Sequence, residues 1–219
     1  MSGERIRRAS LAASAADVKA TLTYYPAGLV QPDHGHGDPH ISLVLTGGFE
    51  EAASGGRTEA RMGDLLQRRE GHSHHVTYGR HGALIVTLQP GAADPPRLDA
   101  IPARARFGGS SVDETPAWLL TARAALLENP AGQSISHLAA RFGVHRVHFS
   151  RAFCDHFGVR PSVVRRQAMV SHALALALGK GEPLAACAQA SGFADQAHLT
   201  RAVKAVCGLP PARLRQLLA

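Results

Sequence analysis

The chain has 219 residues, of which 45% are hydrophobic and only 5% aromatic, and its formal net charge is +7. This size and composition suit one or two modest globular domains, and no run approaches the roughly 18 apolar residues of a transmembrane helix. The arginines near the N-terminus precede only a short, weakly apolar run, so we expect neither a secretory signal nor a membrane partner. Three cysteines, an odd number, favour a reducing cytoplasm over a disulfide framework.

The positive charge is concentrated in the second half of the chain. Residues 111–219 contain 12 Lys and Arg against 6 Asp and Glu, a formal net charge of +6, whereas residues 1–110 carry +1. Such an excess favours an anionic partner such as nucleic acid, although basic surfaces also serve solubility.

The first half has the pattern of a small antiparallel β domain. Between residues 21 and 90, short apolar runs at 43–45, 65–66 and 84–86 alternate with turns that contain glycine. This spacing predicts a small barrel or sandwich. Residues 91–112 are rich in Pro, Gly and Arg and are predicted to be a linker, so the expected domains are residues 1–90 and 113–219.

The second half repeats one helical pattern. Ser134 is a predicted N-cap, Gly143 a predicted tight turn, and a long helix is expected from Pro161. The pattern then returns, with Gly192 as the turn and Asp195 as the cap. The chain therefore predicts two helix-turn-helix units, at about residues 134–156 and 183–206, joined by a long helix.

Residues 136–161 and 185–215 resemble the AraC/XylS family of bacterial transcription regulators. The most specific stretch is Gly-Phe-Ala-Asp-Gln at residues 192–196 followed by His-Leu-Thr-Arg at 198–201. The resemblance implies a seven-helix DNA-binding domain with two helix-turn-helix units. It also implies double-stranded promoter or operator DNA as the partner, with RNA polymerase as a further one.

The same resemblance implies which side chains face the major groove. They are Val147, Ser150 and Arg151 on the first reading helix and Gln196, Ala197, His198, Thr200 and Arg201 on the second. Arg can bind guanine and Gln can bind adenine bidentately, while Thr serves a base or a phosphate. The two arginines could equally clamp phosphates. His148 is expected to pack against the domain, and His145 to be a weaker N-cap than the usual Ser.

Seven of the 13 histidines fall between residues 34 and 81. Their spacing is similar to the two short cupin motifs, which implies a cupin-like antiparallel β barrel and an α+β, two-domain fold. The implied metal ligands are His34, His36, His40 and His74, with His40 where the family usually has Glu. Imidazole ligands suit a divalent transition metal, with zinc favoured and iron, nickel, copper or manganese as alternatives. The other loop histidines, His72, His75 and His81, are expected at the polar surface.

These resemblances predict a transcription regulator without enzymatic activity, whose cupin-like domain senses a metal ion or a small-molecule effector. Two alternatives stay open. An open three-histidine site would suit a metal-dependent cupin oxygenase or isomerase fused to a DNA-binding domain, and the barrel could instead be a dimerisation module without a ligand. The expected state is a monomer, or a homodimer formed through the barrel.

Overall fold

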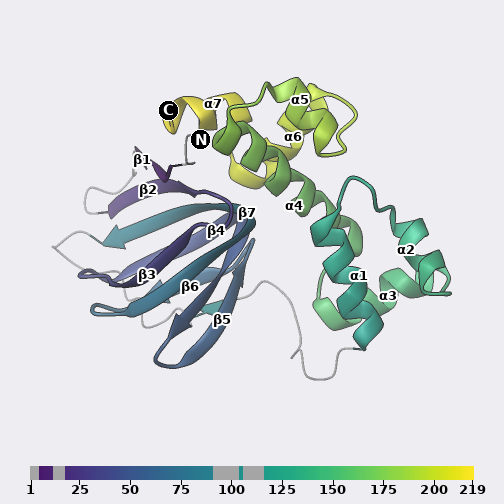
Figure 1. Cartoon of the computed structure of the whole chain (residues 1–219), viewed down its shortest axis with the longest axis horizontal. Helices are drawn as coiled ribbons and strands as arrows, with labels where there is room; N and C mark the ends of the chain where they lie inside the picture. Colours follow the sequence, from purple (N-terminus) through teal and green to yellow (C-terminus); the bar gives the residue numbers. More distant parts are fainter. Residues whose placement is uncertain (1–4, 12–17, 91–103, 106–115) are drawn as a thin grey trace.

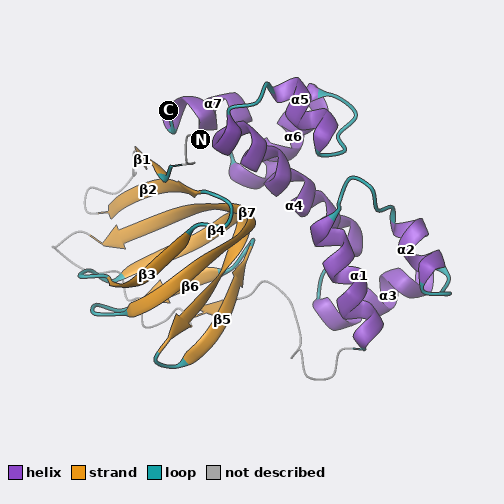
Figure 2. Ribbon diagram, in the orientation of Figure 1, coloured by secondary structure: helices purple, strands orange, loops and turns teal. Residues whose placement is uncertain are grey.

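The computed structural model describes residues 5–11, 18–90, 104–105 and 116–219, with a β-rich N-terminal part and a helical C-terminal part (Figures 1 and 2). The strands are β1 (Arg7–Leu11), β2 (Val18–Tyr25), β3 (Val30–Gly35), β4 (His40–Ala53), β5 (Gly56–Arg61), β6 (Leu65–Arg68), β7 (Ser73–Pro90) and β8 (Arg104–Ala105). The helices are α1 (Ala117–Glu128), α2 (Ile135–Arg141), α3 (Arg146–Phe157), α4 (Pro161–Leu174), α5 (Leu184–Ala190), α6 (Gln196–Cys207) and α7 (Pro211–Leu217). This is the predicted α+β fold, with a cupin-like sheet followed by seven described helices.

All described strands belong to one antiparallel sheet. Each of its two long strands, β4 and β7, pairs with different strands at its start and at its end. The first part of β7 pairs with β3 and its last part with β2. In the same way, β4 pairs with β6 at its start and with β5 at its end. The described strands run in the order β1-β2-β7-β4-β6-β8 without closing into a ring. The described strands therefore form an open sheet, where the resemblance to the cupin motifs had implied a barrel.

The two long strands change partners at a point where their backbones approach closely. A Cβ atom on Gly82 would lie 2.2 Å from the carbonyl oxygen of Tyr25, and one on Gly47 would lie 1.9 Å from that of Gly82. Both glycines also have positive φ, +63° and +74°, a backbone region that disfavours side chains. Here the Gly47 N–H donates to Ser171 Oγ of α4 at 2.9 Å, which ties the sheet to the helices.

The helical part contains two copies of one short-helix, turn, reading-helix unit, as predicted. Ser134 caps α2 by accepting the His137 N–H, and Asp195 caps α6 by accepting the His198 N–H at 2.6 Å. His145 also caps its helix, because its Nδ1 accepts the Val147 N–H at 3.3 Å. His145 therefore caps α3 at the position where a weaker cap than the usual Ser was expected.

The two units have separate apolar cores. The first core lies within the helices and is centred on Leu126, Phe149 and Phe153, all of which are fully buried. The second core joins helices α4 to α7 to the sheet, where Tyr24 and Leu84 pack with them. In agreement, α4 and α6 contact β4, and Figure 1 shows α2 and α3 far from the sheet. The sheet is thus fixed on the second unit.

Helix α4 continues into a π-helical segment, Ala175–Lys180, so one helical rod connects the two units. The segment predicted as a linker contains the short strand β8, which pairs with β6; the rest of that segment, apart from β8, lies outside the described residues. The three cysteines are free thiols. None of the described helices is both long and apolar enough to span a membrane.

Candidate DNA-binding surface and metal centre

Each of the two reading helices, α3 and α6, has one face packed on the core and the opposite face exposed to solvent. On α3, Phe149 and Phe153 are fully buried, whereas Val147 is 57% exposed. On α6, Leu199 and Val203 fill the corresponding inward positions. Of the eight predicted DNA-contacting residues, two are half-buried, Ser150 and Thr200. The other six are exposed: Val147, Arg151, Gln196, Ala197, His198 and Arg201.

Local contacts limit what two of the α6 side chains can do. Thr200 Oγ1 donates its hydrogen bond to the Gln196 carbonyl oxygen at 2.8 Å, so the hydroxyl retains only acceptor capacity. Because phosphate oxygens need donors, Thr200 suits an amino group on a base edge better than a phosphate. The His198 ring packs edge-on against Phe193, with centroids 5.1 Å apart, which orients an otherwise exposed imidazole.

His148 departs from its expected place. The resemblance implied that this ring packs against the domain, but His148 is exposed on α3. The physical reason is its position next to Phe149, which takes the core-facing direction and turns its neighbour about 100° around the helix. His148 is therefore a further exposed, hydrogen-bonding side chain on the first reading helix.

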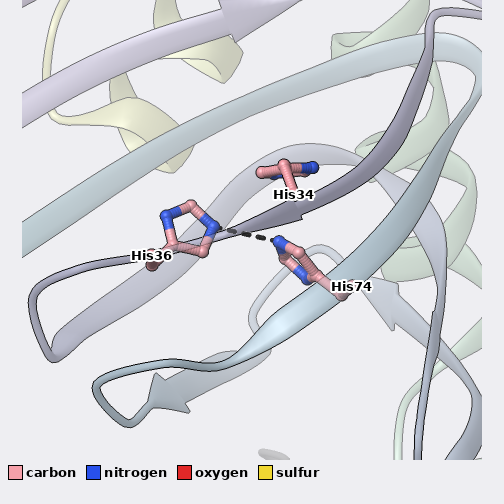
Figure 3. A group of neighbouring side chains, drawn as sticks. All are labelled: His34, His36 and His74. Atoms are coloured by element: carbon pink, nitrogen blue, oxygen red, sulfur yellow. Dashed lines mark hydrogen bonds between the residues drawn. The ribbon is translucent and has the colours of Figure 1, made fainter.

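Three of the four predicted metal ligands converge in one group. His34 on β3 stands in register with His74 on β7, and His36 follows directly after β3. One ring nitrogen from each of His34, His36 and His74 lies within 4.8 Å of the others. The closest pair is His36 Nε2 and His74 Nε2, at 2.9 Å (Figure 3). The three rings thus come from two chain segments that only the sheet brings together.

This donor set fits a transition-metal ion. Two nitrogens bound to one tetrahedral zinc lie about 3.3 Å apart, close to the observed separation of His36 and His74. Burial, together with the nearby charges of His40, His74 and His34, lowers the pKa of His36 to about 4. A neutral imidazole is the form that binds a metal, so protons compete little at neutral pH.

His40 lies beside the group but outside it. Its ring centroid is 4.6 Å from that of His36, and its Nδ1 is 3.2 Å from the Asp38 carbonyl oxygen. An Nδ1–H donated to that carbonyl leaves Nε2 as the unprotonated nitrogen. Burial also lowers the pKa of His40. In this tautomer, Nε2 of His40 is the nitrogen that can bind a metal.

Glu51 is a member of the site that sequence reasoning missed. Its carboxylate is buried, forms an ion pair with Arg68, and lies 2.8 Å from His72 Nε2 and 3.2 Å from His74 Nδ1. The His74 contact is within ion-pair range but is not aligned as a hydrogen bond. Burial alone would raise the pKa of Glu51, but the two histidines and Arg68 outweigh it and lower the pKa to about 2.

A carboxylate on the far nitrogen of a histidine is the usual outer partner of a metal ligand, because it fixes the ring and its tautomer. Here Glu51 faces Nδ1 of His74 while Nε2 of the same ring faces His36. The available sequence signal was strand alternation: Glu51 is two residues after the buried Phe49 on β4 and so points to the same face.

Replacing Glu51 by Gln is expected to weaken zinc binding roughly tenfold without abolishing it. The amide keeps the size of the side chain but removes the charge that holds His72 and His74 in place. Competition with a chromophoric chelator measures the dissociation constant. Glu50→Gln is the matched control, because Glu50 is exposed on the neighbouring position of β4. Equal affinities of the two variants would rule out the positioning role.

A cavity of about 270 Å³ adjoins the histidines inside the sheet. Hydroxyl-bearing side chains, among them Thr23, Ser42 and Thr87, line it together with Arg68 and Tyr25. Ser42 and Thr87 are within hydrogen-bond distance of each other, at 3.2 Å. The cavity therefore has room and hydrogen-bonding groups for a small polar molecule beside the three imidazoles.

His81 was expected at the polar surface, but it pairs with the helical part of the chain. Its ring centroid lies 5.2 Å from that of His172 on α4, and His172 Nδ1 is 3.3 Å from Ser191 Oγ. Burial lowers the pKa of His81 to about 4, assisted by the charges of His172 and Arg80. Burial also lowers the pKa of His172. Both rings are therefore neutral at pH 7.

Acid is expected to weaken this junction. A histidine whose pKa falls on folding takes up protons more readily in the unfolded chain, so the free energy of unfolding declines as the pH drops from 6.5 toward about 4. In the His81→Gln variant this decline should be smaller by roughly 1 kcal/mol, a figure reduced for the partial exposure of the ring. Urea unfolding at several pH values measures it, and identical pH dependences would contradict the assignment.

Comparison with known proteins matches the helical part of the chain to a family. A family described as "Helix-turn-helix domain" matches residues 138–217. Among solved structures, the C-terminal domain of AraT, a response regulator from Geobacillus stearothermophilus, is 19% identical, with 47% of this chain and 87% of that chain covered and a TM-score of 0.44. No curated protein matches the sequence significantly.

Two further solved structures are similar to part of the chain. A cupin domain from Bordetella pertussis is 20% identical, with 42% of this chain and 99% of that chain covered and a TM-score of 0.34. KdgF from Halomonas sp. is 23% identical, with 41% of this chain and 81% of that chain covered and a TM-score of 0.36.

Proposed function

We propose that this chain is a DNA-binding transcription regulator whose cupin-like sheet senses a metal ion or small molecule, because an AraC-type helix-turn-helix domain follows that sheet. Ligand binding in the sheet would change how the helices engage a promoter. In this proposal residues 1–90 are the sensor, 91–112 the linker and 113–219 the DNA-binding domain. The protein acts in the cytoplasm, where its three free thiols stay reduced.

The observation that carries the DNA-binding proposal is the pair of exposed reading helices, α3 and α6, whose units are connected by one long helix. The 14-residue α4 and the six-residue π segment together measure roughly 30 Å, close to the ~34 Å repeat of B-form DNA. Two adjacent major-groove segments are then within reach of α3 and α6. The eight predicted contact residues would read them, with Arg151 and Arg201 binding either guanine edges or phosphates.

The observation that carries the sensing proposal is the convergence of three imidazoles beside a cavity. His34, His36 and His74 would hold the metal, with His40 as a fourth ligand. Zinc is favoured over iron, nickel, copper or manganese, and when bound it would cross-link β3 to β7 and offer a Lewis acid to a polar effector. RNA polymerase is a further proposed partner of the DNA-bound form.

The test uses the full chain and a duplex selected from a random pool. Fluorescence anisotropy gives the dissociation constant in chelator and in one equivalent of zinc, at several salt concentrations. We expect zinc to change the affinity at least about tenfold, and the logarithm of affinity to fall linearly with that of salt. The alternative, in which the sheet is a dimerisation module, would be favoured by a stable dimer whose affinity for the duplex is the same with and without zinc and every small molecule tried.

A second candidate function rests on the same three imidazoles. A three-nitrogen group leaves coordination positions for a substrate, as in metal-dependent oxygenases and isomerases. The regulator is preferred because the acid in contact with His74, Glu51, has its pKa lowered to about 2 and is a poor proton acceptor. Turnover of a small polar substrate by the zinc- or iron-loaded protein would favour the enzyme.

A further inference from the structure

A second, larger cavity lies outside the histidine site, between the sheet and the first helix-turn-helix unit. Its volume is about 560 Å³, within the range of small-molecule sites. On the sheet side it is bounded by Phe49, Met62 and Tyr78. On the helical side its apolar wall comes from α1, α4 and the end of α3 and includes Leu120, Leu127, Phe157 and Val164.

The position of this cavity follows from how unequally the sheet holds the two units. Leu22, Tyr24 and Leu84 of the sheet share one continuous core with α4 to α7, so the second unit is firmly packed. The first unit has its own core, to which no described sheet residue belongs. One direct link to it is the Arg80 Nη1 hydrogen bond to the Glu128 carbonyl oxygen, at 3.2 Å, on the C-terminal end of α1. The cavity occupies the space beside that link.

The charged groups around the cavity are mostly engaged with the protein itself. Arg61 forms an ion pair with Glu59, and its backbone N–H donates to the buried Asp64 carboxylate at 3.0 Å. The guanidinium of Arg123 lies 5.6 Å from the Phe157 ring centroid, in cation–π range. What remains for a ligand is a mainly apolar wall with aromatic rings on both sides, which suits an uncharged molecule that contains a ring.

Two aromatic side chains connect this cavity with the histidine site. Phe49 and Tyr78 line both cavities, and their ring centroids are 5.5 Å apart. Tyr78 is held from the other side by stacking on Tyr25 at 4.4 Å and by donating a hydrogen bond to Gln31 Oε1 at 3.0 Å. A ligand that moves these rings in one cavity would therefore change the shape of the other cavity.

We propose that the cavity between the sheet and the first helix-turn-helix unit binds an uncharged, mainly apolar, ring-bearing small molecule. Such a ligand bridges Phe49 and Tyr78 to Leu120 and Leu127 and so fixes the first reading helix relative to the second. The consequence for DNA binding rests on the proposed function; occupancy of the cavity does not.

The experiment uses N-phenyl-1-naphthylamine, an uncharged fluorescent probe with fused rings, and the full-length protein. Saturable binding at one site per chain is expected. Leu120→Glu places a charge in the apolar wall and should weaken binding at least about tenfold. Val163→Glu is the matched control: both side chains are 40% exposed on a helix, but Val163 does not line the cavity, so its affinity should match that of the unchanged protein.

Hydrogen exchange tests the bridging itself. With saturating probe, amides of α1 should exchange more slowly, along with those of β7 near Tyr78. Equal probe affinities in the two variants, or protection confined to the sheet, would overturn the proposal. If the chain fails to bind any selected duplex but keeps site-specific probe binding, the proposed regulatory function fails while the cavity assignment stands.

Discussion

Replacing His36 by Ala is expected to raise the dissociation constant for zinc at least about 100-fold. His36 Nε2 faces His74 Nε2 at 2.9 Å, and removing it leaves two of the three converging nitrogens. The unchanged protein should gain about 2.7 kcal/mol in free energy of unfolding when free zinc reaches 100 times its dissociation constant. The variant should gain almost nothing at that concentration.

The matched control for this change is His75→Ala. His75 neighbours His74 on β7, so strand alternation points it to the other face of the sheet. It also falls outside the described metal-ligating group. Chelator competition and chemical unfolding with and without zinc give both quantities. Zinc affinity that is the same in both variants would remove the metal from the proposal.

Replacing Arg201 by Ala is expected to weaken binding to the selected duplex by roughly 10- to 100-fold, that is about 1–3 kcal/mol, if the guanidinium reads a base. Arg201 is exposed on α6, on the face away from the buried Leu199 and Val203. Two other predicted DNA-contacting residues of α6, Gln196 and His198, are exposed as well. A base-reading role predicts that the variant loses most affinity for one base pair of the site.

Arg213→Ala is the control because it removes the same charge from another helix. The Arg213 guanidinium is engaged with Gln216 on α7 at 2.6 Å. Anisotropy titrations on the selected site and on an unrelated duplex separate the roles of Arg201. Equal loss on both duplexes, with a shallower salt slope by about one, would assign Arg201 to a phosphate instead.

The helical half was largely predictable because its signals are local. A cap, a turn and the spacing of inward side chains lie within about a dozen residues, and Asp195, Gly192 and Leu199 behave as their pattern indicated. One side chain on these helices was predicted wrongly. His148 was expected to pack against the domain, but the neighbouring Phe149 faces the core and His148 is exposed.

The two reading helices with their caps and turns, and the motif-spaced histidines, could be predicted from the sequence because they depend on neighbours along the chain. Only the tertiary structure decided which of those histidines meet, that Glu51 supports His74, and that the sheet joins the second helix-turn-helix unit but leaves a cavity beside the first. These outcomes depend on contacts such as that between Gly47 and Ser171, which are 124 residues apart. Spacing along the chain carries little information about such contacts, because they form only where separate elements pack together.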